Sequence, residues 1–345
     1  MRYSGDDRRG IAQEVCHGCA GTASAAPIAP GDPDKESVGV IQDFLTAHGQ
    51  RGLPNLVGPG YGTFGPLTSQ ALQNFCAQQG LPAQDQVDGA MLQTIIQSTA
   101  ATPIACRGYL TLVLGFDYTG LAKILSVTAQ MEGSGKFAAL NLNTDGAGLS
   151  FGLIQWAQRP GRLAEIVNAF CQAGSEDFAR IFGAGDLPTA QMLLAHTRKP
   201  NGGVDPACGE AIDPDFDLIH APWVSRFRTA AAFVPYQKVQ VATALADFAQ
   251  SYTRLRQYAT DMTSERSVGF MLDLANQFGD GGAKSIYQAV HKDGMSESEL
   301  MTAIAAESVR RIKNFKAPTQ QRRQSFMSTS FLSDNLFVSS TGAAA

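Results

Sequence analysis

Hydrophobic residues recur every three or four positions along most of the chain, which is the spacing of amphipathic α-helices. Three such stretches come early, with apolar residues at Val38, Ile41, Phe44 and Leu45, at Leu67, Ala71, Leu72 and Phe75, and at Met91, Leu92, Ile95 and Ile96. Gly80 is placed to end the second helix and Asp88 to cap the third. The pattern predicts a compact module of three short helices over residues 36–100.

The same spacing predicts one larger, mainly helical domain over residues 107–335. Its helices are expected near 121–132, 238–258, 267–278 and 296–315. Ser296 and Glu299 have the spacing of a capping box. Residues 141–156 break the helical period and predict a β-hairpin. The expected fold class is therefore mainly α, with a short hairpin in the larger domain.

The two ends of the chain differ from this pattern. Residues 1–35 are rich in small residues and proline and predict a flexible tail, and residues 336–345 predict a frayed C-terminus. No apolar run approaches the roughly 20 residues that span a membrane. The first residues, MRYSGDDRRGIAQEVCHGC, have no apolar centre, so we expect no recognisable signal peptide and delivery by another route.

Composition and charge narrow the possible partners. The net charge is −4 and the sequence pI about 5.7, so nucleic acid is not an expected partner. Cys16 and Cys19 have the spacing of half a zinc site, but no second pair follows. Asp213, Asp215 and Asp217 begin like a calcium loop that lacks its glycine, which favours a solvated acidic loop. No metal and no cofactor are expected.

The stretch GLSFG around Ser150 fits the G-x-S-x-G pattern of a serine nucleophile. That pattern needs a buried strand before the serine and a helix after it. The preceding LNLNTDGAG is polar, and Pro160 would interrupt an early helix. A hairpin hydroxyl near a site is therefore the favoured interpretation of Ser150.

A pair of carboxylates around this hairpin suggests a different chemistry. Glycosidic cleavage needs a proton donor and a second carboxylate that activates water. Glu132 is expected at the end of an apolar helix, where the negative end of the helix dipole disfavours a charged carboxyl. Asp145 lies in the polar loop NTDGAG, which suits a carboxylate that stays ionised. Each residue alone also fits a role without catalysis: Glu132 as a surface glutamate at a helix end, and Asp145 as a turn residue.

Within residues 36–100, one pattern combines Ile41, Gln42 and Leu45, the stretch YGTFGPLTSQALQNF, Gly80 and Leu81, and Val87, Asp88 and Leu92. On these residues the segment resembles the peptidoglycan-binding domain of bacterial wall hydrolases. Cys76 stands where glutamine is usual. The resemblance implies a wall-binding module, with a spacer of the same fold as the alternative.

The stretch EGSGKFAALNLNTDGAGLSFGLIQW resembles the catalytic region of the lysozyme-like superfamily, and within it the family 46 chitosanases. The resemblance implies Glu132 as general acid, Asp145 as general base, and Ser150 in place of a threonine that holds the attacking water. Gln155 is similar to a glutamine of lytic transglycosylases and goose-type lysozymes. Substrate contacts are expected from Asn143, Gln155, Trp156, Asn276 and Gln277, with core packing or internal hydrogen bonding as the alternative for the last three.

Together these patterns predict a cell-wall glycoside hydrolase that cleaves β-1,4 bonds between amino sugars of peptidoglycan. An inverting chitosanase, a non-hydrolytic transglycosylase and a non-catalytic wall-binding protein remain open. Action at the bacterial cell wall after phage lysis or dedicated secretion is expected, and an immunity or delivery partner is left open.

Overall fold

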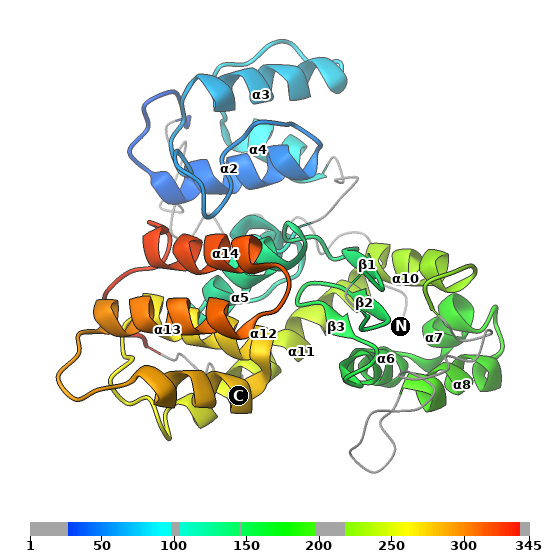
Figure 1. Ribbon diagram of the computed structural model, residues 1–345. Coiled ribbons are helices and arrows are strands. Elements are labelled where there is room, and N and C mark those ends of the chain that lie inside the picture. Colours follow the sequence, from blue (N-terminus) through cyan, green and yellow to red (C-terminus); the bar gives the residue numbers. More distant parts are fainter. Residues whose placement is uncertain (1–26, 98–103, 145, 198–217, 339–345) are drawn as a thin grey trace. The chain divides into compact units, whose positions relative to one another are not determined.

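The computed structural model describes residues 27–97, 104–144, 146–197 and 218–338 (Figure 1). Of the residues that the structure describes, 60% are in helices and 5% in strands, which confirms the mainly α fold class. It divides into two compact units: unit 1 is Met1–Val127 with Ser251–Ala345, and unit 2 is Thr128–Gln250. The domain boundaries expected from the sequence stay a prediction.

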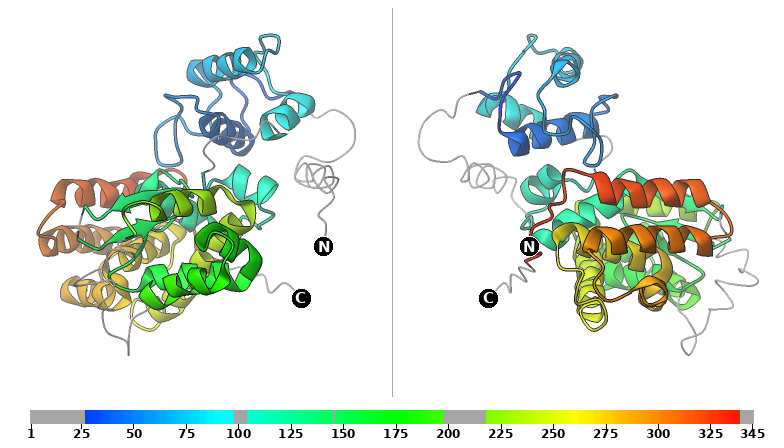
Figure 2. Two further views of the ribbon diagram at one scale, coloured as in Figure 1. Left: turned by 90° about the vertical axis from the view of Figure 1, so that its right-hand side faces the viewer. Right: turned by 60° about the vertical axis from the view of Figure 1, so that its left-hand side comes forward.

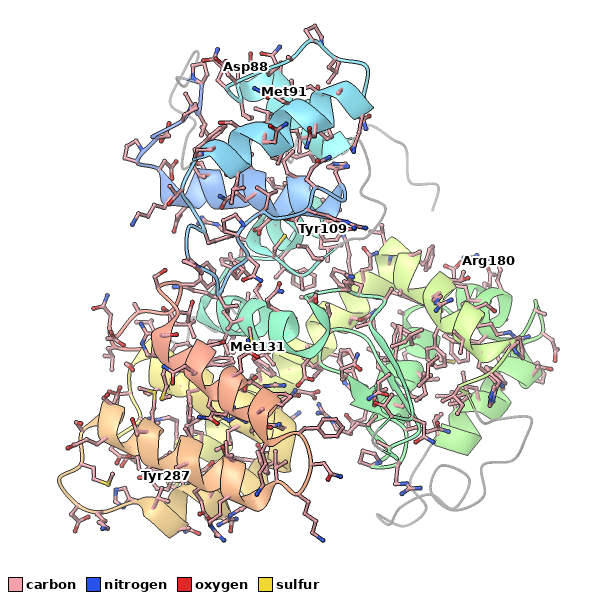
Figure 3. All side chains as sticks on the ribbon, turned by 45° about the horizontal axis from the view of Figure 1, so that its top comes forward. Asp88, Met91, Tyr109, Met131, Arg180 and Tyr287 are labelled. Atoms are coloured by element: carbon pink, nitrogen blue, oxygen red, sulfur yellow. The ribbon has the colours of Figure 1, made fainter. Side chains whose placement is uncertain are left out.

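Three helices form the early part of unit 1: α2 (Lys35–Ala47), α3 (Pro66–Gln78) and α4 (Gly89–Gln97). Both α3 and α4 pack against α2. Asp88 caps α4 by accepting the Met91 N–H at 2.7 Å, and both residues are labelled in Figure 3. Gly80 has φ +66° and ends α3 with a bond from Leu81 N–H to the Cys76 carbonyl (2.8 Å).

The motif that carries the wall-binding resemblance forms an internal hydrogen-bond network. The fully buried Gln42 amide donates to the Thr63 carbonyl (3.0 Å) and Thr68 Oγ1 (2.9 Å) and accepts from Gly62 N–H (2.8 Å). Thr68 therefore begins the buried face of α3. The sequence places Leu67 on that face as well. Its side chain is instead 60% exposed, because Leu67 lies one position before Thr68, the first buried residue of the helix.

A second group of helices completes unit 1. A π-helical turn (Tyr109–Val113) and the first part of α5 (Gly120–Gly133) come before unit 2, which begins within α5 at Thr128. The helices α12 (Glu265–Val290), α13 (Glu297–Arg311) and α14 (Lys316–Ser328) come after unit 2. The last three pack against one another (Figure 2). The capping box of Ser296 and Glu299 is confirmed. The expected helix at 296–315 is shorter: α13 ends at Arg311 because Ile312 is extended (φ −80°, ψ 129°), and α14 begins after the left-handed Phe315.

Contacts within unit 1 join the small helices to the rest of that unit. Gly108 lies so close to α2 that a Cβ there would come within 2.8 Å of the Phe44 ring. Thr329 Oγ1 donates to the Leu56 carbonyl at 3.3 Å, and the rings of Tyr61 and Phe331 meet edge to face. The early helices are therefore packed against their own unit rather than held by the chain alone.

Unit 2 is built around a three-stranded antiparallel sheet of β1 (Leu140–Leu142), β2 (Leu149–Phe151) and β3 (Trp156–Ala157), in that order. After the sheet, the helices described for unit 2 are α6 (Arg162–Ala173), α7 (Ser175–Phe182), α8 (Leu187–Thr197), α10 (Trp223–Ala232) and α11 (Val234–Leu255), the last continuing into unit 1. Phe151 packs in an aromatic core with Phe170 and Phe227. The short sheet confirms the β structure expected for residues 141–156.

Candidate active site

Glu132 lies in the last turn of α5 and is half-buried. Met131, which precedes it, is labelled in Figure 3. The helix ends here because Ser134 (φ 56°) and Gly135 (φ 72°) are left-handed, and Gly135 N–H bonds the Ala129 carbonyl at 2.8 Å. The chain then returns so closely that a Cβ on Gly133 would lie 2.3 Å from the Ala139 Cβ. The carboxylate therefore stands where the helix meets the sheet.

Ser150 occupies the middle of β2, opposite Asn141 on β1 and Ala157 on β3. Because side chains alternate along a strand, Ser150 faces away from Leu149 and Phe151, yet all three are buried, with Ser150 only 4% exposed. A turn and then β3 follow it, not a helix. This segment therefore lacks the strand–turn–helix geometry of a nucleophile elbow.

The loop between β1 and β2 is held by two asparagine side chains. Asn141 Oδ1 accepts the N–H and hydroxyl of Thr144, at 2.9 and 2.8 Å. Asn143 Oδ1 accepts Gly148 N–H at 2.9 Å, with Asn143 itself left-handed (φ 65°). Asp145 belongs to this loop but lies outside the described residues. Asn143 thus has a clear role in shaping the loop that carries Asp145, whereas its expected glycan contact stays a prediction.

Gln155 and Trp156 differ in what they offer a substrate. Gln155 is left-handed (φ 53°), and its Nε2 donates to the carbonyls of Ala139 (3.2 Å) and Gly152 (3.0 Å), so it ties the turn after β2 to the start of β1. The Trp156 side chain is fully buried, and its Nε1 has no hydrogen-bond partner. Its indole therefore belongs to the core of unit 2 and presents no face on which a sugar ring can stack.

Asn276 and Gln277, the other expected glycan contacts, lie on α12 in unit 1. Gln277 Oε1 accepts from the Arg323 guanidinium, and its Nε2 donates to Thr319 Oγ1 at 3.4 Å. Gln277 thus takes part in a polar network of its own unit, the alternative interpretation of the sequence. Asn276 is half-buried.

Two buried glutamines that the sequence did not single out support β2 at its two ends. Gln158 Oε1 accepts Leu149 N–H at 3.0 Å, and Gln240 Oε1 accepts Leu153 N–H at 3.2 Å. The burial of Gln240 could have been predicted from the sequence. Gln240 lies one helical turn before Ala244 and two turns before Phe248, so it falls on the apolar face of α11. A polar residue in a buried helical stripe needs a partner.

Other candidate chemistries find little support in the described part of the chain. There, no three His, Cys, Asp or Glu side chains gather in a way that could hold a metal ion. Cys16, Cys19 and the acidic stretch 213–217 lie outside the described residues. No helix among the residues that the structure describes combines the length and apolar character that crossing a bilayer requires.

Comparison with known proteins does not assign the chain to a family. No protein-family model matches the chain, and no curated protein matches its sequence.

Proposed function

We propose that this protein is a glycoside hydrolase that cleaves β-1,4 bonds between amino sugars of peptidoglycan by general acid and base catalysis. The observation that carries the proposal is the placement of Glu132 in the last turn of α5, directly before a three-stranded sheet whose first loop contains Asp145. A half-buried carboxylic acid at a helix end suits a proton donor to the leaving oxygen.

In this mechanism Glu132 protonates the glycosidic oxygen while Asp145 takes a proton from the attacking water. Ser150, on the sheet, holds that water by a hydrogen bond. A water on the opposite face of the sugar requires carboxyl groups roughly 6.5 to 9.5 Å apart and gives inversion at the anomeric carbon. The helices α2, α3 and α4 bind the wall polymer and raise the local concentration of glycan.

The proposal is tested by incubating the protein with purified sacculi and, separately, with chitosan, and by analysing the products by mass spectrometry. Wild-type protein is expected to release reducing muropeptides from sacculi. Glu132→Gln and Asp145→Asn are expected to lose this activity, because each keeps the shape of the side chain and removes its acid or base. Glu176→Gln, at an exposed glutamate of α7, is the matched control and should remain active.

Other products would lead to other conclusions. Anhydromuramyl products would mean transglycosylation, for which one glutamate suffices. Products from chitosan alone would identify a chitosanase. Binding to sacculi without any product would overturn the enzymatic proposal and leave a wall-binding protein.

A further inference from the structure

One side-chain amide in unit 2 joins two separate stretches of backbone. Gln240, on α11, is fully buried. Its Oε1 accepts the N–H of Leu153 at 3.2 Å, in the turn that follows β2. Its Nε2 donates to the carbonyl of Phe137 at 3.3 Å, in the connection between α5 and β1. An amide is suited to this position because it donates and accepts at once.

The turn after β2 is shaped around this amide. Gly152 has φ +79°, and a Cβ there would lie 2.5 Å from Gln240 Oε1. The backbone therefore approaches the amide more closely than any residue with a side chain allows. Gly152 N–H in turn bonds the Ala139 carbonyl at 2.9 Å, so the anchored turn also holds the start of β1.

Both anchored stretches flank the candidate catalytic residues. Phe137 follows Glu132 in the short connection to the sheet, and Leu153 follows Ser150 on β2. We propose that Gln240 is a positioning residue, which fixes the Glu132 carboxyl relative to the Ser150 strand by holding both stretches to α11. This inference rests on the proposed glycosidase function. Gln240 is not expected to touch the substrate, because its side chain has no exposed surface.

The first test compares Gln240→Met with wild-type protein on soluble glycan fragments of peptidoglycan. Methionine keeps the length and volume of glutamine, but it cannot donate a hydrogen bond and its thioether sulfur is only a weak acceptor. We expect kcat to fall about 10- to 100-fold with little change in KM, because a displaced general acid slows the chemical step more than binding. Gln237→Met is the matched control: Gln237 is also a buried glutamine of α11, but its amide donates locally, to the Ala231 carbonyl at 2.8 Å.

The second test uses the pH profile of Gln240→Glu. An ionised glutamate can accept from Leu153 N–H but repels the Phe137 carbonyl, whereas a protonated glutamate can both accept and donate. Because burial raises the pKa of a carboxyl, the activity of Gln240→Glu relative to wild type should be low at alkaline pH and recover as the pH falls. A purely structural loss of packing would show no such recovery.

The outcomes separate this inference from the proposed function. If Gln240→Met keeps wild-type kcat, or if Gln240→Glu stays at a constant fraction of wild-type activity at all pH values, the positioning role is overturned. If wild-type protein cleaves no glycan, the proposed function itself fails. In that case hydrogen exchange of residues 133–141 and 149–157 still tests the anchoring, and unchanged exchange in Gln240→Met would refute it.

Discussion

The Tyr61 hydroxyl donates a 2.8 Å hydrogen bond to the carboxyl of Asp43, inside unit 1. The Asp43 side chain is only 4% exposed, and the Cys106 thiol lies against it. Burial raises the pKa of Asp43 from 3.8 to about 7, although the hydrogen bonds from Tyr61 and Cys106 oppose the shift. Asp43 belongs to α2 and Cys106 to the segment after residues 98–103, so this contact helps to hold the small helices to the rest of the unit.

The first prediction concerns the pH dependence of folding. Since folding raises the pKa of Asp43, its contribution to stability is complete below about pH 4 and is lost as the pH rises to about 7. The loss is about 4 kcal/mol at most, from about 1.4 kcal/mol per pKa unit. Asp43→Asn, which keeps an acceptor for Tyr61, should flatten this decline. The free energy of unfolding is measured between pH 4 and 8 by urea unfolding monitored by circular dichroism.

The control for this prediction is Asp85→Asn, at an exposed aspartate near the start of α4. Its curve should run parallel to that of wild type. Parallel curves for Asp43→Asn as well would show that Asp43 does not titrate in this range.

A second buried carboxylate in unit 1 behaves in the opposite sense. Asp273 is fully buried and accepts bonds of 2.6 Å from both Arg322 Nη2 and Arg323 Nη1. Burial alone would raise its pKa, but the two guanidiniums outweigh burial and lower it. Asp273→Asn should therefore cost about 3 to 5 kcal/mol at neutral pH, because it leaves the buried Arg323 without its counter-charge. Thermal unfolding by circular dichroism checks this.

Arg310→Gln supplies the comparison, since the Arg310 side chain is 72% exposed and pairs with Glu307 on the surface of α13. Such a pair should contribute less than about 1 kcal/mol. Equal losses in Asp273→Asn and Arg310→Gln would contradict the prediction. Gln277→Met should also lower the thermal stability, since Gln277 bonds Arg323, whereas its binding to sacculi, measured separately, should be unchanged.

The third prediction separates the two interpretations of Ser150. As a hydroxyl that orients water, Ser150→Ala should lower kcat about tenfold, the equivalent of one hydrogen bond. Glu132→Gln should lower it about 10²- to 10⁴-fold, as expected for loss of a general acid. Labelling of wild-type protein by a fluorophosphonate, prevented by Ser150→Ala, would instead establish a serine nucleophile.

Local features of this fold could be predicted from the sequence because they depend on neighbouring residues. Asp88 caps the helix that begins at the next residue, Gly80 ends a helix, and the capping box of Ser296 and Glu299 spans a single turn. The hairpin after Glu132 was predictable for the same reason, because glycines and asparagines interrupt the helical spacing over a short stretch.

The contacts that position the candidate site could not be predicted in this way, because they join distant parts of the chain. Gln240 bonds residues 87 and 103 positions away. Trp156 has the residue type of a sugar platform, but its burial depends on the packing of the whole unit. A single sequence also shows nothing of which polar side chain meets Arg323 across α12 and α14, so Gln277 resembled a substrate contact as much as a structural one.

The fourth prediction tests the close approach of the hairpin turn to α11. Gly152→Ala should destabilise unit 2, because the new Cβ would meet Gln240 Oε1 at 2.5 Å and Trp156 Cζ3 at 3.1 Å. Gly146→Ala is a matched control, since Gly146 has nearly the same backbone (φ +78°) but nothing within 4 Å of a Cβ. In both variants an alanine in a left-handed backbone conformation costs about 1 to 2 kcal/mol of stability. Only in Gly152→Ala does the new Cβ also collide with neighbouring side chains.

Urea unfolding followed by tryptophan emission measures this difference, because both tryptophans of the chain, Trp156 and Trp223, belong to unit 2. A double-mutant cycle then identifies the cause. Gln240→Ala removes the atom that the new Cβ would meet, so Gly152→Ala should cost less in the Gln240→Ala background than in wild type. Additive losses would mean that the turn and the α11 amide are independent, and the left-handed backbone of Gly152 alone would then account for the glycine.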